Sequence, residues 1–400
     1  MNTRPDKLFT RDYCLMLCAN FMLYMGFYLL LPVLPFYLAE RMNADNATIG
    51  VVLSCYTVAA LCIRPFAGFL LDTFARKPLY LLAYGIFVLI FVGYHWTAWI
   101  ALFVVFRAIH GLSFGMVTVA GSTIVIDVMP SSRRGEGLGY YGMANNISMA
   151  VGPMLGLFLH DAYSFDVIFI TALIVSSIGF VCAKLVRPRV KEPVARKAIS
   201  LDRFVLLRGI PGGVALLMLS IPYGVTTTYI AMYGQELGIE ISTGVFFSLM
   251  AIGIASSRVF SGKLVDKGYV TEIILVSIAL TMIPFIGLAV CPAVAAISTK
   301  YVTVMFMACA AFIGIAFGVL FPAYNSFFVN LAPNSERGTA VSTYLTSWDL
   351  GIGAGLMMGG YVSSVIGFDA AYAIGAGLSV VSWLWFFFYV DPRYKREKLK

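Results

Sequence analysis

The segment 64-RPFAGFLLD-72 returns later in the chain as 258-RVFSGKLVD-266, after an offset of 194 residues. An arginine, a glycine and an aspartate keep the same spacing in both copies. Further matches follow at an offset of 203: Gly111, Phe114 and Gly115 with Gly314, Phe317 and Gly318; the Pro-x-Ser-x-Arg-Gly segments at 130–135 and 333–338; and Gly152 and Gly156 with Gly355 and Gly359. Chance does not produce so many agreements at fixed offsets, so the sequence indicates a duplicated unit.

The composition places both copies in a membrane. Of the 400 residues 60% are hydrophobic and only 12% are charged, whereas soluble domains carry about 25% charged residues. A helix that crosses a bilayer needs roughly 20 mostly apolar residues. Charge-free runs that meet this need recur along the chain, at 13–39, 46–63, 78–106, 137–160, 209–235, 273–299 and 370–390. The predicted fold class is therefore an all-α polytopic membrane protein.

We predict twelve transmembrane helices, near 13–38, 48–71, 78–95, 98–128, 135–160, 165–186, 205–235, 242–266, 272–291, 302–330, 337–366 and 369–390. The first run is too long for a cleaved signal sequence and is expected to stay as the first helix. Of the 28 lysines and arginines, only Arg41 and Lys300 would face outward if both termini are cytoplasmic. This bias orients the protein by the positive-inside rule. It explains the net charge of +8 by topology and contact with anionic lipid, and it disfavours nucleic-acid binding.

The polar segment 187-RPRVKEPVARKAISLDR-203 divides the helices six and six. We therefore predict an N-terminal six-helix bundle at 1–187, a cytoplasmic linker at 188–203 and a C-terminal six-helix bundle at 204–400. Two parallel repeats are typical of transporters that open a midplane site alternately to each side. The whole chain resembles the major facilitator superfamily, and this resemblance implies a transporter acting as a monomer.

The loop 68-GFLLDTFARK-77 resembles the signature loop of that superfamily. The resemblance implies a latch that holds the cytoplasmic gate shut, made by Asp72, Arg76 and the acid that ends helix 4, Asp127. In the second copy, no Arg-Lys pair follows the aspartate and Asn330 stands where Asp127 has its match, so the second latch is expected to be weaker. The alternative is that these charges only set the orientation of the helices in the membrane. The predicted latch residues are Arg64, Gly68, Asp72, Arg76, Lys77, Asp127, Arg258 and Asp266.

Helix 4 carries an arginine inside a membrane segment, in 104-VVFRAIHGLSFG-115. A buried arginine is costly in a bilayer and normally faces a partner or a wet cavity. His110 lies one turn after Arg107, and its side chain titrates near neutral pH. We expect both residues to take part in proton coupling, although the histidine could equally be a packing residue.

Helix 5 carries Gly152-Pro153-x-x-Gly156, which resembles a motif of exporters and antiporters in the superfamily. Two glycines four residues apart permit close helix packing, and the proline can kink the helix. Glycine and proline are common in membrane helices, so the motif favours export only because it occupies its matched place in the repeat.

By analogy with the superfamily, helices 1, 4, 7 and 10 should line the substrate cavity. Aromatic rings with hydroxyl groups suit an amphipathic substrate, although tyrosines also serve as interfacial anchors. The predicted substrate-binding residues are Asn20, Tyr24, Tyr28, Arg107, Asn145, Asn146, Tyr223, Thr226, Thr227, Tyr233, Tyr324 and Asn325.

One acid stands near the middle of a spanning segment, in 344-YLTSWDLGIG-353. Ser342, Thr346 and Gly353 share a helix face with Asp349 at i−7, i−3 and i+4. A carboxylate that loses its water binds protons more readily, so we expect Asp349 to carry the proton that drives transport. A structural hydrogen bond to a neighbouring helix is the alternative. The repeat pairs this aspartate with Asn146 of helix 5.

The leading hypothesis is a proton-coupled exporter of a small amphipathic organic compound that resembles a drug, a sugar or a siderophore. Proton-coupled nutrient uptake is the runner-up, and a non-transporting membrane sensor or enzyme is a remote alternative. The chain lacks a Gly-x-x-x-x-Gly-Lys-Ser/Thr segment, which excludes a P-loop ATPase. No cofactor or metal is expected. The short loops favour a plasma membrane, most naturally the inner membrane of a bacterium.

Overall fold

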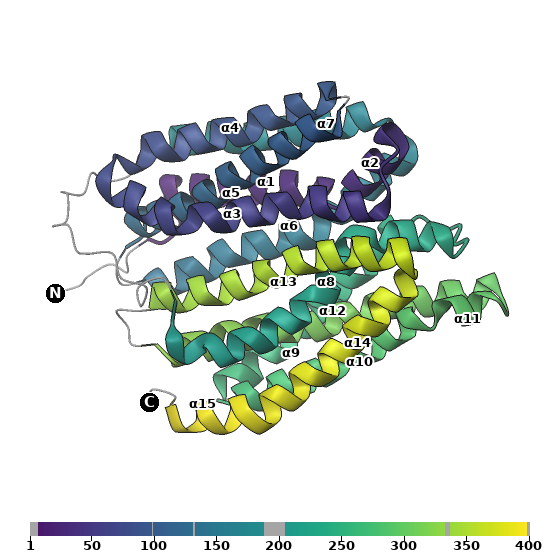
Figure 1. The fold of residues 1–400 in the computed structure, drawn as a ribbon. Coiled ribbons are helices and arrows are strands. Elements are labelled where there is room, and N and C mark those ends of the chain that lie inside the picture. The colour runs from purple at the N-terminus through teal and green to yellow at the C-terminus, as the bar shows by residue number, and fades with distance from the viewer. Residues whose placement is uncertain (1–6, 98, 131–132, 188–204, 333–336, 398–400) are drawn as a thin grey trace. The chain divides into compact units, whose positions relative to one another are not determined.

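The structure, a computed structural model, describes residues 7–97, 99–130, 133–187, 205–332 and 337–397 (Figure 1). Regular structure in these ranges is helical throughout. The chain separates into two compact units. Unit 1 comprises Met1–Tyr37 and Val58–Lys197, and unit 2 comprises Leu38–Thr57 and Ala198–Lys400. The predicted division at residues 188–203 stays a prediction, because the linker lies outside the described residues.

The helices of the first half correspond to the six predicted there, with one difference. They are α1 (Arg11–Leu30), α2 (Leu34–Met42), α3 (Asn46–Thr73), α4 (Arg76–Trp96), α5 (Ile100–Val128), α6 (Arg134–Ala162) and α7 (Phe165–Leu185). The first predicted helix, 13–38, is broken into α1 and α2. At the break Leu31 donates to the Tyr28 carbonyl oxygen at 3.3 Å and Val33 to that of Leu30 at 3.0 Å. Pro32 between them has no N–H to donate, so it favours this tighter bonding pattern.

The second half begins with a single 3₁₀ turn, η3 (Leu207–Gly209), and ends in a continuous helical path from α14 to α15 (Figure 1). Its helices are α8 (Ile210–Glu236), α9 (Gly244–Asp266), α10 (Val270–Ala289), α11 (Cys291–Ala295), α12 (Thr299–Asn330), α13 (Arg337–Val365), α14 (Phe368–Trp385), the π-helical turn η4 (Phe386–Val390) and α15 (Asp391–Glu397). The helix predicted at 272–291 lies two residues earlier in the structure, as α10, and the separate short helix α11 follows it with Pro292 in its first turn.

Ten helices of the described chain are long and apolar enough to cross a membrane. Two further helices lie at the remaining predicted positions. Helix α9 has a shorter apolar stretch, Gly244–Ser257, and α13 is 29 residues long. The prediction of an all-α polytopic membrane protein is confirmed.

Helix packing repeats from one half of the chain to the other. Within unit 1, α1 packs against α6 and α7, while α4 packs against α5 and α7. Within unit 2, α8 packs against α13 and α14 in the same way, and α10 packs against α12 and α14. The sequence repeat is therefore also a repeat of helix contacts.

Candidate functional site

An ion pair joins the start of α4 to the end of α5. The Arg76 guanidinium lies 2.6 Å from the Asp127 carboxylate. The aspartate side chain is only 5% exposed, whereas the arginine is 28% exposed. The Nε atom of Arg76 also donates to the carbonyl oxygen of Leu71, near the end of α3, at 3.5 Å. The Arg76 side chain thus contacts the ends of α3 and α5 from the start of α4.

This pair brings together two of the eight predicted latch residues, and two of the three (Asp72, Arg76 and Asp127) that the resemblance implies for the latch itself. The surroundings of Gly68 and the side chains of Asp72, Arg258 and Asp266 lie outside the described residues. Arg64 and Lys77 are half-buried on α3 and α4. The gating role of all these residues stays a prediction.

The arginine and the histidine predicted on α5 meet a residue of α4 that the sequence reasoning missed. The Tyr94 hydroxyl lies 2.9 Å from His110 Nδ1, and Arg107 Nη1 donates to the same hydroxyl at 3.5 Å. All three residues are buried, with exposures of 2% or less. Figure 1 shows α4 and α5, the two helices that carry them.

The histidine is also surrounded by rings of α4. Its ring centroid lies 4.3 Å from that of Phe87 and 5.0 Å from that of Phe91. A sequence signal for this surrounding did exist. Aromatic residues recur along α4 at helical spacing, as Tyr80, Tyr84, Phe87, Phe91 and Tyr94, and they are buried. The structure therefore places His110 within the packing between α4 and α5.

Unit 1 holds an aromatic cluster built from α1 and α5. Tyr24 stacks on Tyr28 with a centroid distance of 6.0 Å and meets Phe114 edge-on at 5.4 Å. Phe27 stacks on Phe114 at 5.0 Å. We call these four residues the first aromatic cluster. Two of them, Tyr24 and Tyr28, were predicted to bind substrate.

Three predicted asparagines of unit 1 lie on α1 and α6. Asn20 is buried and donates to the carbonyl oxygen of Tyr141 on α6 at 3.1 Å. Asn145 has a buried side-chain oxygen with no hydrogen-bond partner among the described residues. The side chain of Asn146 lies outside the described residues. Asn145 is thus a polar acceptor still available to a ligand or to water.

The Gly-Pro-x-x-Gly motif of α6 packs directly on α1. A Cβ atom added to Gly152 would lie 2.7 Å from Cβ of Tyr28, and one added to Gly156 would overlap the carbonyl oxygen of Leu29. Pro153 lies inside the helix between them. The matched glycine of the second half, Gly355, would in the same way overlap a backbone carbonyl of α8. A glycine thus permits a close backbone contact at this place in both halves, although the second half lacks the proline.

Unit 2 holds a second aromatic cluster, made by Tyr223 of α8, Phe317 and Phe321 of α12, and Trp348 of α13. The Tyr223 centroid lies 4.6 Å from that of Phe317 and 4.9 Å from that of Trp348. Phe321 meets Trp348 edge-on at 4.8 Å. The repeat pairs Phe317 with Phe114 of the first aromatic cluster, which is the sequence signal that could have found it.

The other residues predicted on α8 and α12 are buried, with the exception of Asn325. Tyr233 is buried and donates to the Leu288 carbonyl oxygen at 2.8 Å. Thr226 and Thr227 are buried and donate to carbonyl oxygens of their own helix. Tyr324 is buried, and its hydroxyl has no hydrogen-bond partner among the described residues, whereas Asn325 is exposed. Their role in substrate binding stays a prediction.

The predicted proton carrier stands next to the second aromatic cluster. Asp349 follows Trp348 directly and is half-buried on α13. Gly353, one turn later on the same face, lies against Thr57 of unit 2. The carboxylate therefore sits inside a spanning helix and in a partly covered position.

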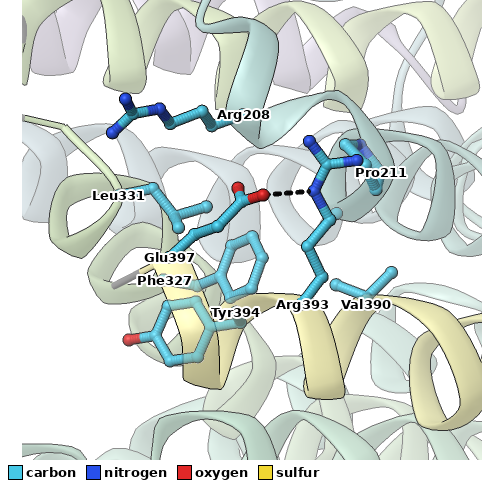
Figure 2. A pocket seen from close by; sticks show the side chains of 9 residues that line it. Arg208, Pro211, Phe327, Leu331, Val390, Arg393, Tyr394 and Glu397 are labelled. Atoms are coloured by element: carbon cyan, nitrogen blue, oxygen red, sulfur yellow. Dashed lines mark hydrogen bonds and ion pairs between the residues drawn. The ribbon is translucent and has the colours of Figure 1, made fainter. Parts of the chain in front are cut away.

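A small pocket of about 190 Å³, open solvent included, lies elsewhere in unit 2. Figure 2 shows it between the start of α8, the end of α12 and α15, with Arg393 paired to Glu397 at 2.9 Å. Tyr394 stacks on Phe327 there with a centroid distance of 4.7 Å. None of the residues predicted to bind substrate lines this pocket. The pocket lies where α15 packs against α8 and α12.

Comparisons with known proteins agree with this architecture. The sequence profile of the Major Facilitator Superfamily matches residues 16–299 and, in a second match, residues 273–400. The multidrug resistance protein MdtG of Escherichia coli is 28% identical over 385 residues, which cover 90% of each chain. The staphylopine export protein of Staphylococcus aureus is 23% identical over 352 residues, which cover 85% of this chain and 86% of that one.

Two solved structures show the same fold. The nucleoside transporter NupG superposes with a TM-score of 0.73 at 15% identity, covering 94% of this chain and 98% of that one. The human organic anion transporter MFSD10 superposes with a TM-score of 0.70 at 17% identity, covering 94% of this chain and 99% of that one.

Proposed function

Because the chain belongs to the major facilitator superfamily and is a multi-pass secondary transporter rather than an enzyme, we propose that it exports a small amphipathic organic compound in exchange for protons. The observation that carries the proposal is the pair Trp348–Asp349. Consecutive residues of one spanning helix supply a ring of the second aromatic cluster and a carboxylate. Substrate stacking and proton binding would then act on the same segment of α13.

Export, rather than uptake, is supported by the relatives and by the helix contacts of α6. The two relatives named above are described as an export protein and a multidrug resistance protein. The Gly-Pro-x-x-Gly motif, which resembles that of exporters, makes the backbone contact with α1 that such a motif permits. Proton-coupled uptake is the alternative.

The substrate class follows from the two aromatic clusters. Each combines tyrosine hydroxyls with phenylalanine rings, and the clusters occupy matched places in the repeat through Phe114 and Phe317. Rings supply apolar contact area and hydroxyls orient a ligand. We assign Asn145, with its available carbonyl oxygen, to the same substrate contact. A compound with an apolar body and a few polar groups fits this lining.

The proposal includes the membrane, the orientation and the oligomeric state of the protein. We assign both termini to the cytoplasm from the distribution of the lysines and arginines. The bacterial relatives support an inner membrane, and membership of the superfamily supports a monomer. The halves 1–187 and 204–400 would be the two moving bundles, joined by the linker at 188–203.

Inverted membrane vesicles that contain the protein test both direction and coupling. Respiration acidifies the vesicle lumen, and acridine orange reports the gradient. An added compound that is exchanged for lumenal protons restores the fluorescence, whereas a symporter with an empty lumen leaves it unchanged. A panel of small amphipathic compounds supplies the probes.

The matched variants are Asp349→Asn and Asp369→Asn, the second at the first turn of α14. We expect Asp349→Asn to abolish the fluorescence response while Asp369→Asn retains it. A full response in Asp349→Asn would contradict its role in proton coupling. Failure of every compound to restore fluorescence in the unaltered protein would contradict proton-coupled export itself.

A further inference from the structure

Two cysteines of unit 1 face each other across the contact between α1 and α7. The Cys182 thiol of α7 donates to the Cys18 sulfur of α1 at 3.5 Å. Both side chains are half-buried, and both are free thiols. The two residues are 164 positions apart in the sequence, so only the fold brings them together.

The helices around this pair are held in a close antiparallel contact. On one side, a Cβ atom added to Gly179 would lie 2.8 Å from Cβ of Met22. On the other side, the backbone N–H of Arg187 donates to the Asp12 carboxylate at 3.1 Å. The two sulfur atoms are thus positioned by contacts both before and after them along α1.

A disulfide needs its sulfur atoms about 2.05 Å apart and its Cα atoms about 4.4–6.8 Å apart. Helices that touch through a glycine bring their backbones close, and the remaining 1.5 Å or so between the sulfurs can be closed by side-chain rotation. The 3.5 Å between the sulfurs and the close approach of the two helices at Gly179 thus support a disulfide at this contact.

The mechanical effect of such a bond follows from the break after α1. Helix α1 ends at the interruption around Pro32, where it can change its tilt relative to α2. Cys18 lies in the first half of α1, about 20 Å before that break at 1.5 Å per residue. A covalent bond there would hold this half of the helix that carries Asn20, Tyr24 and Tyr28.

We propose that Cys18 and Cys182 form a reversible redox site, in which a hydroperoxide joins α1 to α7 and slows transport. With hydrogen peroxide, one thiol gives up its proton and its sulfur attacks a peroxide oxygen, the O–O bond breaks, and the departing hydroxide takes up that proton and leaves as water, so that a sulfenic acid forms. The second thiol gives up its proton and its sulfur attacks the sulfenic sulfur, the S–O bond breaks, and the departing hydroxide takes up this proton and leaves as a second water. Two thiols are oxidised by two electrons as one peroxide is reduced. A dithiol reductant restores both thiols by exchange.

The crosslink is tested in native membranes with hydrogen peroxide as the probe. Free thiols are trapped with N-ethylmaleimide, and peptides are mapped by mass spectrometry without reduction. We expect a linked peptide pair that contains Cys18 and Cys182, and loss of two of the seven thiols, both reversed by dithiothreitol. The exposed Cys14, one turn earlier on α1, supplies the matched control, because Cys14→Ser should crosslink as the unaltered protein does.

The mechanical effect is tested by two further measurements on the same samples. Peroxide should raise the apparent melting temperature of the detergent-solubilised protein and remove most of the transport rate in the vesicle assay. Cys18→Ser and Cys182→Ser should show neither change. Peroxide treatment that yields other pairings, or that yields this pair while melting and transport stay unchanged, would overturn the proposal.

The transport measurement rests on the proposed function, but the crosslink and melting measurements do not. A protein that crosslinks and gains thermal stability, yet transports nothing when reduced, would contradict the proposed function and leave the disulfide established. A reduced protein that transports well but forms no such disulfide would contradict the redox site alone.

Discussion

Buried polar side chains inside a membrane bundle must form hydrogen bonds with other protein groups, because lipid offers them none. Tyr94 shows how this works in unit 1. Its hydroxyl can donate to His110 Nδ1 at 2.9 Å while it accepts from Arg107 at 3.5 Å. Tyr94 thus links the Arg107 guanidinium to the His110 ring, one turn away on α5, and holds both side chains in position.

We predict that Tyr94→Phe destabilises the protein by about 1–3 kcal/mol, because it removes a buried hydroxyl on which a donor and an acceptor depend. The apparent melting temperature in detergent measures the loss. Tyr140→Phe is the matched control, since Tyr140 is 38% exposed and water can replace its hydroxyl contacts. Equal melting shifts in the two variants would show that the connection contributes nothing to stability.

The ion pair between Arg76 and Asp127 makes a second prediction at the residue scale. Its short distance and the low exposure of the acid favour an interaction stronger than that of an open surface pair. We expect Arg76→Gln and Asp127→Asn each to cost about 1–2 kcal/mol and the double variant to cost clearly less than their sum. Melting temperatures of the four proteins give the coupling. Strictly additive losses would mean that the two residues act independently.

At the scale of helices, glycine positions decide how closely two helices approach. Helix α6 offers a matched pair of sites, because a Cβ atom at Gly156 would overlap the Leu29 carbonyl oxygen whereas one at Gly142 would meet nothing within 4 Å. We predict that Gly156→Ala destabilises the protein by about 1–3 kcal/mol through overpacking. Gly142→Ala should be neutral or slightly stabilising, since alanine is the better helix former. A neutral Gly156→Ala in melting experiments would contradict the proposed backbone contact.

Most helices could be predicted from the sequence because charge-free runs of sufficient length leave few other folds in a membrane. The break around Pro32 could not, because proline also occurs inside spanning helices here, as Pro153 does in α6. Local sequence does not say which of these prolines a neighbouring helix accommodates.

The site was predictable in its chemistry but less so in its partners. Arg107 and His110 stand out as polar residues of a spanning segment, whereas Tyr94 is one of many tyrosines. The aromatic residues at helical spacing mark the packed face of α4, but its sequence does not say which residues of which helix that face meets. Trp348 is likewise one tryptophan among five until the repeat and the structure place it against Tyr223.

At the scale of the whole molecule, the boundary between the two sequence copies differs from the boundary between unit 1 and unit 2. Residues 38–57 belong to the first copy in sequence and to unit 2 in space. Within unit 2, a Cβ atom added to Gly50 of α3 would lie 2.8 Å from the carbonyl oxygen of Leu356 on α13. A fragment that ends in the linker therefore lacks a backbone contact that α3 makes in the full chain.

This arrangement predicts how the chain behaves when it is divided. Expressed alone, the fragments 1–195 and 196–400 should each be degraded or aggregate, because α3 and α13 leave a close-packed face uncovered. Expressed together, they should associate and recover compound-dependent proton exchange in inverted vesicles. A control division between Phe312 and Ile313, inside α12, should recover none, because it opens a helix that packs against α9 and α10. Halves that can be purified separately, are stable and do not associate would show that residues 38–57 are not needed to complete unit 2. Equal recovery of proton exchange from both divisions would show that the linker is not a boundary between separately folding parts.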